Sequence, residues 1–216
     1  MRFSWVWTAL LLLLVAGVSP AAEQGLPLPV TSEQLAAYYV QAPDVTEFYL
    51  RPEYAAQAVP FSREGAAVPR QGHFFGRHSI PPETRCYRVG RFPAGGGVYG
   101  LVVYNNVGEA DTVCLNVELL GYDGRGTLRD ALLIENRYGY EDVECHTAFE
   151  IDAEGVSIDY YVTYVVYVDE GGNMADPVID PKPELFRQER YRFTGGRFEL
   201  THQREWEPQS WRRPER

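Results

Sequence analysis

The stretch Val156–Val168, VSIDYYVTYVVYV, decides the fold class of this 216-residue chain. Every second residue from Val156 to Val168 is apolar or aromatic, whereas Ser157, Asp159 and Thr163 fall on the positions between them. Successive side chains of a strand point to opposite faces, so this alternation predicts a strand with one buried face.

Runs of the same kind flank this stretch on both sides. The connecting segments between these runs are too short to contain crossover helices, so the strands should be antiparallel. We predict a mainly β fold, an antiparallel meander of about seven to nine strands that closes into a barrel or a sandwich, because a single open sheet would leave one apolar face in water. The predicted strands are Val98–Asn105, Thr112–Leu120, Leu128–Asn136, Val143–Ile151 and a closing hairpin, Arg190–Phe193 with Arg197–Leu200.

The chain that precedes the sheet is less regular. Thr31–Gln34 has the pattern of a capping box, and Leu35, Tyr38 and Tyr39 follow at helical spacing, so we expect a short N-terminal helix that ends near Gln41. The expected organisation is a signal peptide at 1–21, a helix and loop segment at 22–82, the β domain at 83–200 and a polar tail at 201–216.

The first 21 residues have the layout of a secretory signal peptide. Arg2 precedes the apolar run Trp5–Val18, and small residues precede a predicted cleavage between Ala21 and Ala22. As a helix this run would span about 21 Å, less than the roughly 30 Å of a bilayer core, so we expect no stable membrane insertion after cleavage. Arginine outnumbers lysine nineteen to one, a bias typical of GC-rich bacterial genomes. The prediction is an exported bacterial protein in the periplasm or outside the cell.

The charge of the chain limits the classes of partner that it is expected to bind. The formal net charge is −10, which argues against a nucleic-acid-binding protein. The charge is unevenly spread, since 61–91 carries an excess of arginine and 109–185 an excess of acids. In the simpler explanation, the basic and acidic segments pair across the fold or are exposed to solvent on its surface. In the other, the acidic segment forms a face that attracts a cation or a basic partner.

Cys86, Cys114 and Cys145 leave an odd number of thiols in an oxidising compartment. In meander order Cys114 and Cys145 lie two strands apart, about 9.6 Å, which exceeds the limit of roughly 7 Å between the Cα atoms of a disulfide. The sequence leaves two alternatives: one disulfide with one free thiol, or three free thiols. Cys145-His146 does not form a nucleophile pair on a strand, because neighbouring side chains point to opposite faces, and Cys145 shares a core face with Thr147, Phe149 and Ile151.

His73 and His78 lie five residues apart in a glycine-containing loop. Such histidines could ligate a metal or serve an atypical hydrolase site, although nearby arginines disfavour a cation. The alternative is a loop that buries Phe74 and Phe75.

The acidic turn with Asp169, Glu170 and Asp176 offers oxygen ligands for calcium. Its spacing differs from the EF-hand loop, and acids are common in exposed turns. A calcium-stabilised surface module is therefore one alternative function.

Fifteen tyrosines are the remaining feature of the composition. Tyr161 and Tyr167 fall on the less apolar face of their strand, where aromatic side chains suit peptide or sugar recognition. Cross-strand packing is the simpler explanation of these tyrosines.

The segments GTLRDALLIENRYGYED, ECHTAFEIDAEGVSIDYYV and RYRFTGGRFEL follow one another between Val98 and Leu200. This succession of strands and turns resembles exported bacterial β-rich proteins of unknown function. The resemblance implies a fold and no chemistry.

The chain contains no Gly-x-Ser-x-Gly, His-Glu-x-x-His, P-loop, dinucleotide fingerprint or Cys-x-x-Cys. We therefore expect a non-catalytic binding or interaction protein without a cofactor, whose partner is another exported or envelope protein. A hydrolase that uses His73 and His78 is the alternative from a different class.

Overall fold

The computed structural model describes residues 25–42, 47–73, 80–108, 111–140, 142–168 and 173–210. The predicted signal peptide lies outside these ranges, as do His78, Asp169 and Glu170.

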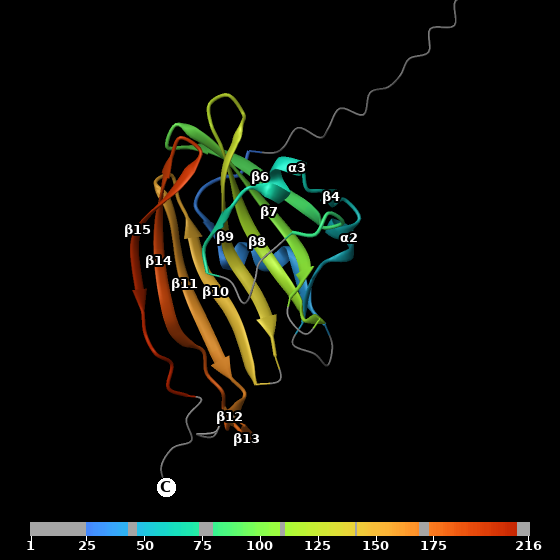
Figure 1. The fold of residues 1–216 in the computed structure, drawn as a ribbon, viewed down its shortest axis with the longest axis vertical. Helices are drawn as coiled ribbons and strands as arrows, with labels where there is room; N and C mark the ends of the chain where they lie inside the picture. The colour runs from blue at the N-terminus through green and yellow to red at the C-terminus, as the bar shows by residue number, and fades with distance from the viewer. Residues whose placement is uncertain are drawn as a thin grey trace, which may run out of the picture.

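A large antiparallel sheet dominates the molecule, as the alternating patterns predict (Figure 1). It has 11 strands, and its main path runs β15-β14-β11-β10-β9-β8-β7-β6-β4. From β6 to β11 the strands are neighbours in chain order, which confirms the predicted meander. The long strands are β6 (Arg85–Ala94), β7 (Gly97–Val107), β8 (Val113–Tyr122), β9 (Leu128–Gly139), β10 (Val143–Ile151), β11 (Gly155–Tyr164), β14 (Glu184–Thr194) and β15 (Arg197–Glu205).

Short elements border this sheet. Strand β4 (Val59–Pro60) pairs with β6, while β1 (Val30–Thr31) pairs with β10 and β5 (Arg70–Gln71) runs parallel to β9. Two small sheets stand apart: β2 (Tyr39–Gln41) with β3 (Phe48–Leu50), and β12 (Val166–Val168) with β13 (Met174–Pro177).

The expected N-terminal helix is present but shorter than predicted. Helix α1 (Ser32–Leu35) begins with the capping box of Thr31 and Gln34, and the 3₁₀ turn η1 (Ala36–Tyr38) follows it. Tyr39 then begins β2, because its buried side chain and pairing with Leu50 override the helical spacing. Two more short helices, α2 (Pro52–Ala55) and α3 (Arg63–Ala67), fall in the segment predicted as loop.

Most predicted strands have different ends in the structure; β14, for example, begins at Glu184, six residues before the predicted Arg190. The Val156–Val168 stretch breaks at Val165, whose N–H bonds the Asp142 carbonyl, so β12 leaves the main sheet. Strand β15 extends to Glu205, five residues into the segment expected to be a polar tail, because it continues to pair with β14. Polar residues lie on both faces of this edge strand, so the alternation of apolar and polar residues does not predict it.

The sheet does not close into a barrel, and a sandwich describes it better. Strands β9 and β10 pair only at Gly139–Glu144 and Tyr138–Cys145, and beyond this point they separate. Thr147 marks the split, since its N–H donates to Glu135 Oε1 and its hydroxyl donates to the Ile134 carbonyl.

The split between β9 and β10 divides the main sheet into two halves, which end at β4 and at β15. Side chains also join these two halves at the start of β15. The outward N–H of Phe198 donates to Asp130 Oδ2 at 3.1 Å, and Gln71 Nε2 donates to the Phe198 carbonyl at 3.0 Å. The Gln71 amide also donates to Asp130 at 2.7 Å. Gln71 and Asp130 therefore take the place of a neighbouring strand at the start of β15.

Glycines bring the β6–β7 and β14–β15 turns into direct contact. Gly195 N–H donates to the Gly95 carbonyl at 2.7 Å, and a methyl group on Gly97 or Gly121 would overlap the backbone of Gly196. Gly196 itself has φ of +83°, which other residues rarely adopt. We call Gly95, Gly97, Gly121 and Gly196 the glycine junction.

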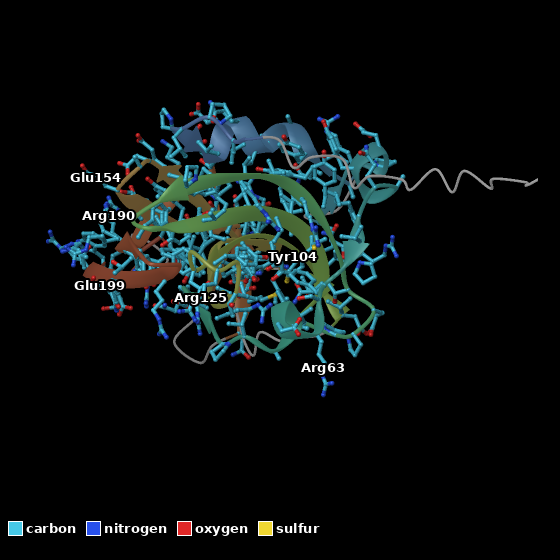
Figure 2. The ribbon with its side chains drawn as sticks, turned by 90° about the horizontal axis from the view of Figure 1, so that it is seen from above. Arg63, Tyr104, Arg125, Glu154, Arg190 and Glu199 are labelled. Carbon is cyan, nitrogen blue, oxygen red and sulfur yellow. The ribbon has the colours of Figure 1, made fainter. Side chains whose placement is uncertain are left out.

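The larger apolar core lies between the two halves of the sheet and the N-terminal elements. The even positions Val156, Ile158, Tyr160 and Val162 are buried, as their alternation predicts. A smaller core on the other face is covered by the segment around α3, and in Figure 2 Tyr104 lies inside while Arg63, Arg125 and Glu199 project outward. Residues of the smaller core are Cys86, Val102, Tyr104, Leu120 and Ala131.

Candidate functional site

A surface groove of about 280 Å³, lined mostly by apolar residues, lies beside the N-terminal lead-in. One wall is the extended segment Leu26–Val30, and the other comes from α1, η1 and β6. Its polar side chains are Gln34, whose carbonyl oxygen accepts the Thr31 N–H at 3.0 Å, and the phenol of Tyr38. The lining residues are Leu26, Pro27, Leu28, Pro29, Val30, Gln34, Leu35, Tyr38 and Val89.

Three tyrosine rings cluster at one end of this groove. The ring centroids of Tyr38 and Tyr54 are 4.8 Å apart, those of Tyr54 and Tyr87 4.9 Å, and those of Tyr38 and Tyr87 5.7 Å. All three rings are half-buried and pack on the larger core. We refer to the groove together with Tyr38, Tyr54 and Tyr87 as the tyrosine groove.

Three separate segments hold these rings in place. Tyr38 ends η1, just after the capping box has started the chain into a helical turn. Pro52 occupies the first turn of α2, where its missing N–H costs nothing, and positions Tyr54. Tyr87 lies on β6, two residues before Val89 of the groove, and the β-bulge between Arg88 and Gly90 interrupts the strand there.

Burial raises the pKa of Tyr38, and the nearby phenols of Tyr87 and Tyr54 raise it further. The Tyr38 phenol is therefore protonated at neutral pH and can donate a hydrogen bond to a ligand. Half-buried aromatic rings with a polar tip are typical of sites that bind proteins or peptides.

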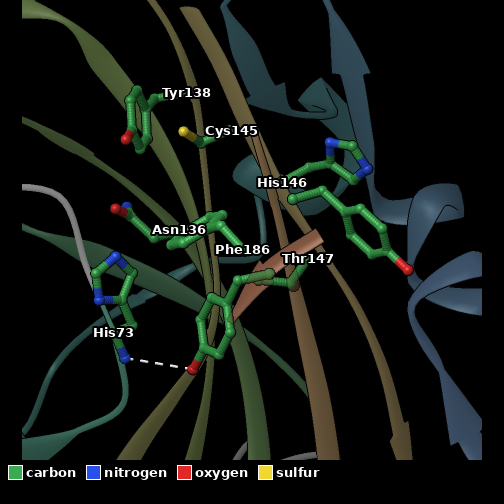
Figure 3. A pocket seen from close by; sticks show the side chains of 9 residues that line it. His73, Asn136, Tyr138, Cys145, His146, Thr147 and Phe186 are labelled. Carbon is green, nitrogen blue, oxygen red and sulfur yellow. Dashed lines mark hydrogen bonds between the residues drawn. The ribbon is translucent and has the colours of Figure 1, made fainter. Parts of the chain in front are cut away.

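The predicted His73 is packed between aromatic rings rather than placed in an open cleft. Its ring contacts Tyr160 and Phe186 edge-on, each with centroids 5.5 Å away. The backbone N–H of His73 donates to the Tyr160 hydroxyl at 3.3 Å (Figure 3). Burial lowers the pKa of His73, and the charge of Arg187 lowers it further. The adjoining cavity is only about 20 Å³, enough for one water molecule.

Cys145 and His146 lie on opposite faces of β10, as predicted, and Figure 3 shows their side chains pointing apart. Burial raises the pKa of the Cys145 thiol to about 11, so the nucleophilic thiolate is scarce at neutral pH. His146 instead stacks on Tyr161, with ring centroids 5.3 Å apart and planes at 10°.

Cys86, Cys114 and Cys145 are all free thiols. Strand β7 separates Cys86 on β6 from Cys114 on β8, and β9 separates Cys114 from Cys145, so the meander order keeps the three apart. Burial raises the pKa of Cys86 to about 11 as well. The structure therefore gives these cysteines the character of buried small side chains.

The two tyrosines predicted as ligand contacts lie on different sheets. Tyr161 belongs to β11 of the main sheet, half-buried against His146, whereas Tyr167 belongs to β12. The break at Val165 separates them.

Of the predicted calcium ligands, only Asp176 falls within the described residues, where it is exposed on β13. Across those ranges, no three His, Cys, Asp or Glu side chains stand close enough together to hold a metal ion.

Three buried glutamates are a feature that pattern reasoning missed. Glu118 accepts from Arg70 Nε at 3.0 Å and from the Tyr104 hydroxyl at 2.8 Å, while Arg70 also binds the carbonyls of Gly65, Ala66 and Val68. This pair anchors the α3 segment on the sheet. Glu135, beside Arg137, and Glu189 form similar buried pairs, the latter with hydroxyls from Tyr160 and Tyr191.

A second, wider groove of about 410 Å³ crosses the outer face of β10 and β11 beside α1. Its lining is polar, with Glu33, Glu150, Asp159 and Arg190 around Ala148. Arg190 already pairs with Asp159 at 3.0 Å. This surface has the character of a solvated sheet face.

Sequence patterns did not identify the tyrosine groove, because its residues come from three segments that no local period links. The only available signal was Tyr38, which the helical spacing placed on a buried face. Pro52, which falls in the segment interpreted as loop, instead starts α2 and places Tyr54.

No helix in the described ranges combines the length and apolar character needed to cross a bilayer. Comparison with known proteins finds no family model, no curated protein and no solved structure that matches this chain.

Proposed function

We propose that this protein is a non-catalytic binding module of an exported space, and that the tyrosine groove holds its ligand. The proposed ligand is an extended, proline-containing segment of another exported or envelope protein.

The observation that carries the proposal is the combination of an apolar groove with Tyr38, Tyr54 and Tyr87 at its end. Binding sites are usually concave and mostly apolar, with a few polar groups that orient the ligand. The tyrosine groove has this composition, whereas the groove beside Arg190 is polar and the cavity beside His73 has room for only a single water.

Proline suits this site for two physical reasons. Tyrosine rings offer flat apolar surface at a low cost in conformational entropy, and a pyrrolidine ring can pack flat on them. A polyproline II segment makes no internal hydrogen bonds, so its carbonyls are free to accept from the phenol of Tyr38.

Export is part of the same proposal. The support is the leader-like composition of 1–21, with its positive start, apolar run and small residues before Ala22. The intact mass of the protein purified from a periplasmic or culture fraction tests this point, with a product beginning at Ala22 expected. A product that retains Met1 would contradict it.

The binding proposal is tested by titration calorimetry with a short peptide of alternating proline and leucine. A peptide with glycine in place of proline is the ligand control. We expect the proline peptide to bind, and Tyr38→Ser, at the tyrosine that lines the groove, to weaken its affinity at least tenfold, about 1.4 kcal/mol.

Tyr49→Ser is the matched protein control, because Tyr49 is 37% exposed on β3 and does not line the groove. Its affinity should equal that of the wild type. Equal binding of the two peptides, or equal losses in the two variants, would refute the proposed site.

A further inference from the structure

Beyond Phe198, the outer edge of β15 is not covered by any strand of the described residues. Its seven residues from Glu199 to Glu205 are all exposed, and among the described residues no strand pairs with this edge. At the opposite edge, β6 is covered by β4 and by a bridge from Gly25 to Arg91.

The backbone of this edge has an irregular spacing. The Phe198 N–H points outward to Asp130, so the backbone N–H and C=O of Leu200, two residues further on, also point outward. The Trp206 N–H points inward to the Phe186 carbonyl, so the backbone N–H and C=O groups of Glu205 and Gln203 point outward. A β-bulge at Thr201 therefore separates the outward groups of Leu200 and Gln203 by three residues instead of two.

A regular extended peptide presents outward groups at every second residue and cannot match both Leu200 and Gln203. A second β15 edge has the same spacing when it runs antiparallel. About a two-fold axis between Thr201 and His202, Leu200 faces Gln203 of the partner subunit, and Gln203 faces the partner's Leu200.

The charges agree with this register. Glu199 faces Arg204 of the partner subunit, and the symmetry repeats this pair, so two opposite-charge contacts form on one face of the joined sheet. Both side chains are exposed in the single chain. Like-charged residues do not oppose one another anywhere between Glu199 and Arg204.

We propose that two copies of this chain associate through their β15 edges, antiparallel about Thr201 and His202, into one continuous sheet. The overlap ends at Phe198, whose outward groups are already held by Gln71 and Asp130. The short overlap predicts a reversible dimer that forms at high protein concentration.

Sedimentation velocity on the mature chain, from low micromolar to near-millimolar concentration, tests this proposal. Leu200→Pro removes an outward N–H without removing a bond to β14, and it should shift the dimerisation midpoint at least tenfold upward. Arg204→Glu should have the same effect, and the double variant Glu199→Arg/Arg204→Glu should restore dimerisation.

Arg63→Glu, at the exposed start of α3 and far from Glu199 in Figure 2, is the charge-matched control and should dimerise like the wild type. A wild-type chain that stays monomeric at all concentrations would overturn the proposal. So would a dimer unaffected by Arg204→Glu, and this second variant decides the matter if Leu200→Pro fails to fold.

Discussion

Strand β6 takes part in two regions that are built in opposite ways. At its end, the glycine junction lets two turns meet backbone to backbone, because Gly97, Gly121 and Gly196 carry no side chains. In its middle, Tyr87 and Val89 contribute large side chains to the tyrosine groove.

This difference separates the close packing of the junction from the proposed ligand binding of the groove within one strand. The glycine junction has no space left for a ligand and joins the two halves of the sheet. The tyrosine groove keeps three aromatic rings half-buried, so part of their apolar surface stays in contact with water. Substitutions at the junction should therefore affect folding, and substitutions in the groove should affect binding.

The largest expected effect is at Gly121. Near the end of β8, the Gly121→Ala methyl group would overlap the Gly196 carbonyl, which belongs to the tight β14–β15 turn. We expect the free energy of unfolding to fall by about 3 kcal/mol, the upper range for overpacking a core. Denaturant unfolding measures this change.

Gly124→Ala is the matched control for that substitution. Nothing lies within 4 Å of the added methyl group, so its effect should stay within about 0.5 kcal/mol. Similar losses in both variants would show that the junction is not the constraint described above.

A smaller effect is expected where side chains join the same two halves. Asp130→Ala leaves the N–H of Phe198 and the amide of Gln71 without their acceptor, which should cost about 1–2 kcal/mol. Asp130→Asn keeps one acceptor oxygen and should cost less. Thermal unfolding of the two variants compares them, and equal stability to the wild type would mean that this bridge contributes nothing.

The smallest effect concerns pH. Burial lowers the pKa of His146 to about 4 from an ordinary 6.5, so the unfolded chain binds a proton more readily between these values. This group therefore makes the protein less stable as pH falls from 6.5 to 4. We expect about 1 kcal/mol, because the partly exposed ring is screened by water.

Burial raises the pKa of Glu118 and Glu135, which acts in the opposite direction as pH falls. The difference between wild type and His146→Gln isolates the histidine. The variant should lose less stability than the wild type over this range, and parallel curves would contradict the prediction.

The sheet could be predicted from the sequence because each long strand carries its own alternation. Val143–Ile151 was predicted with its exact ends, and the hairpin turn at Gly195-Gly196 needs only local information. The split between β9 and β10 could not be predicted, since it depends on Thr147 and Glu135 meeting across strands.

The functional surface was harder to predict for the same reason. Tyr161 and Tyr167 share one alternating run, yet the break at Val165 sends them to different sheets. Tyr38, Tyr54 and Tyr87 are far apart in the chain and share no period, so only the folded structure brings their rings together.

Hydrogen–deuterium exchange with and without the proline–leucine peptide compares the two regions of β6 most directly. We predict slower exchange on peptide binding at Leu26, Leu28, Tyr87 and Val89, with no change at Gly95–Gly97. Protection at the glycine junction, or unchanged exchange along the tyrosine groove while the peptide is bound, would contradict the account.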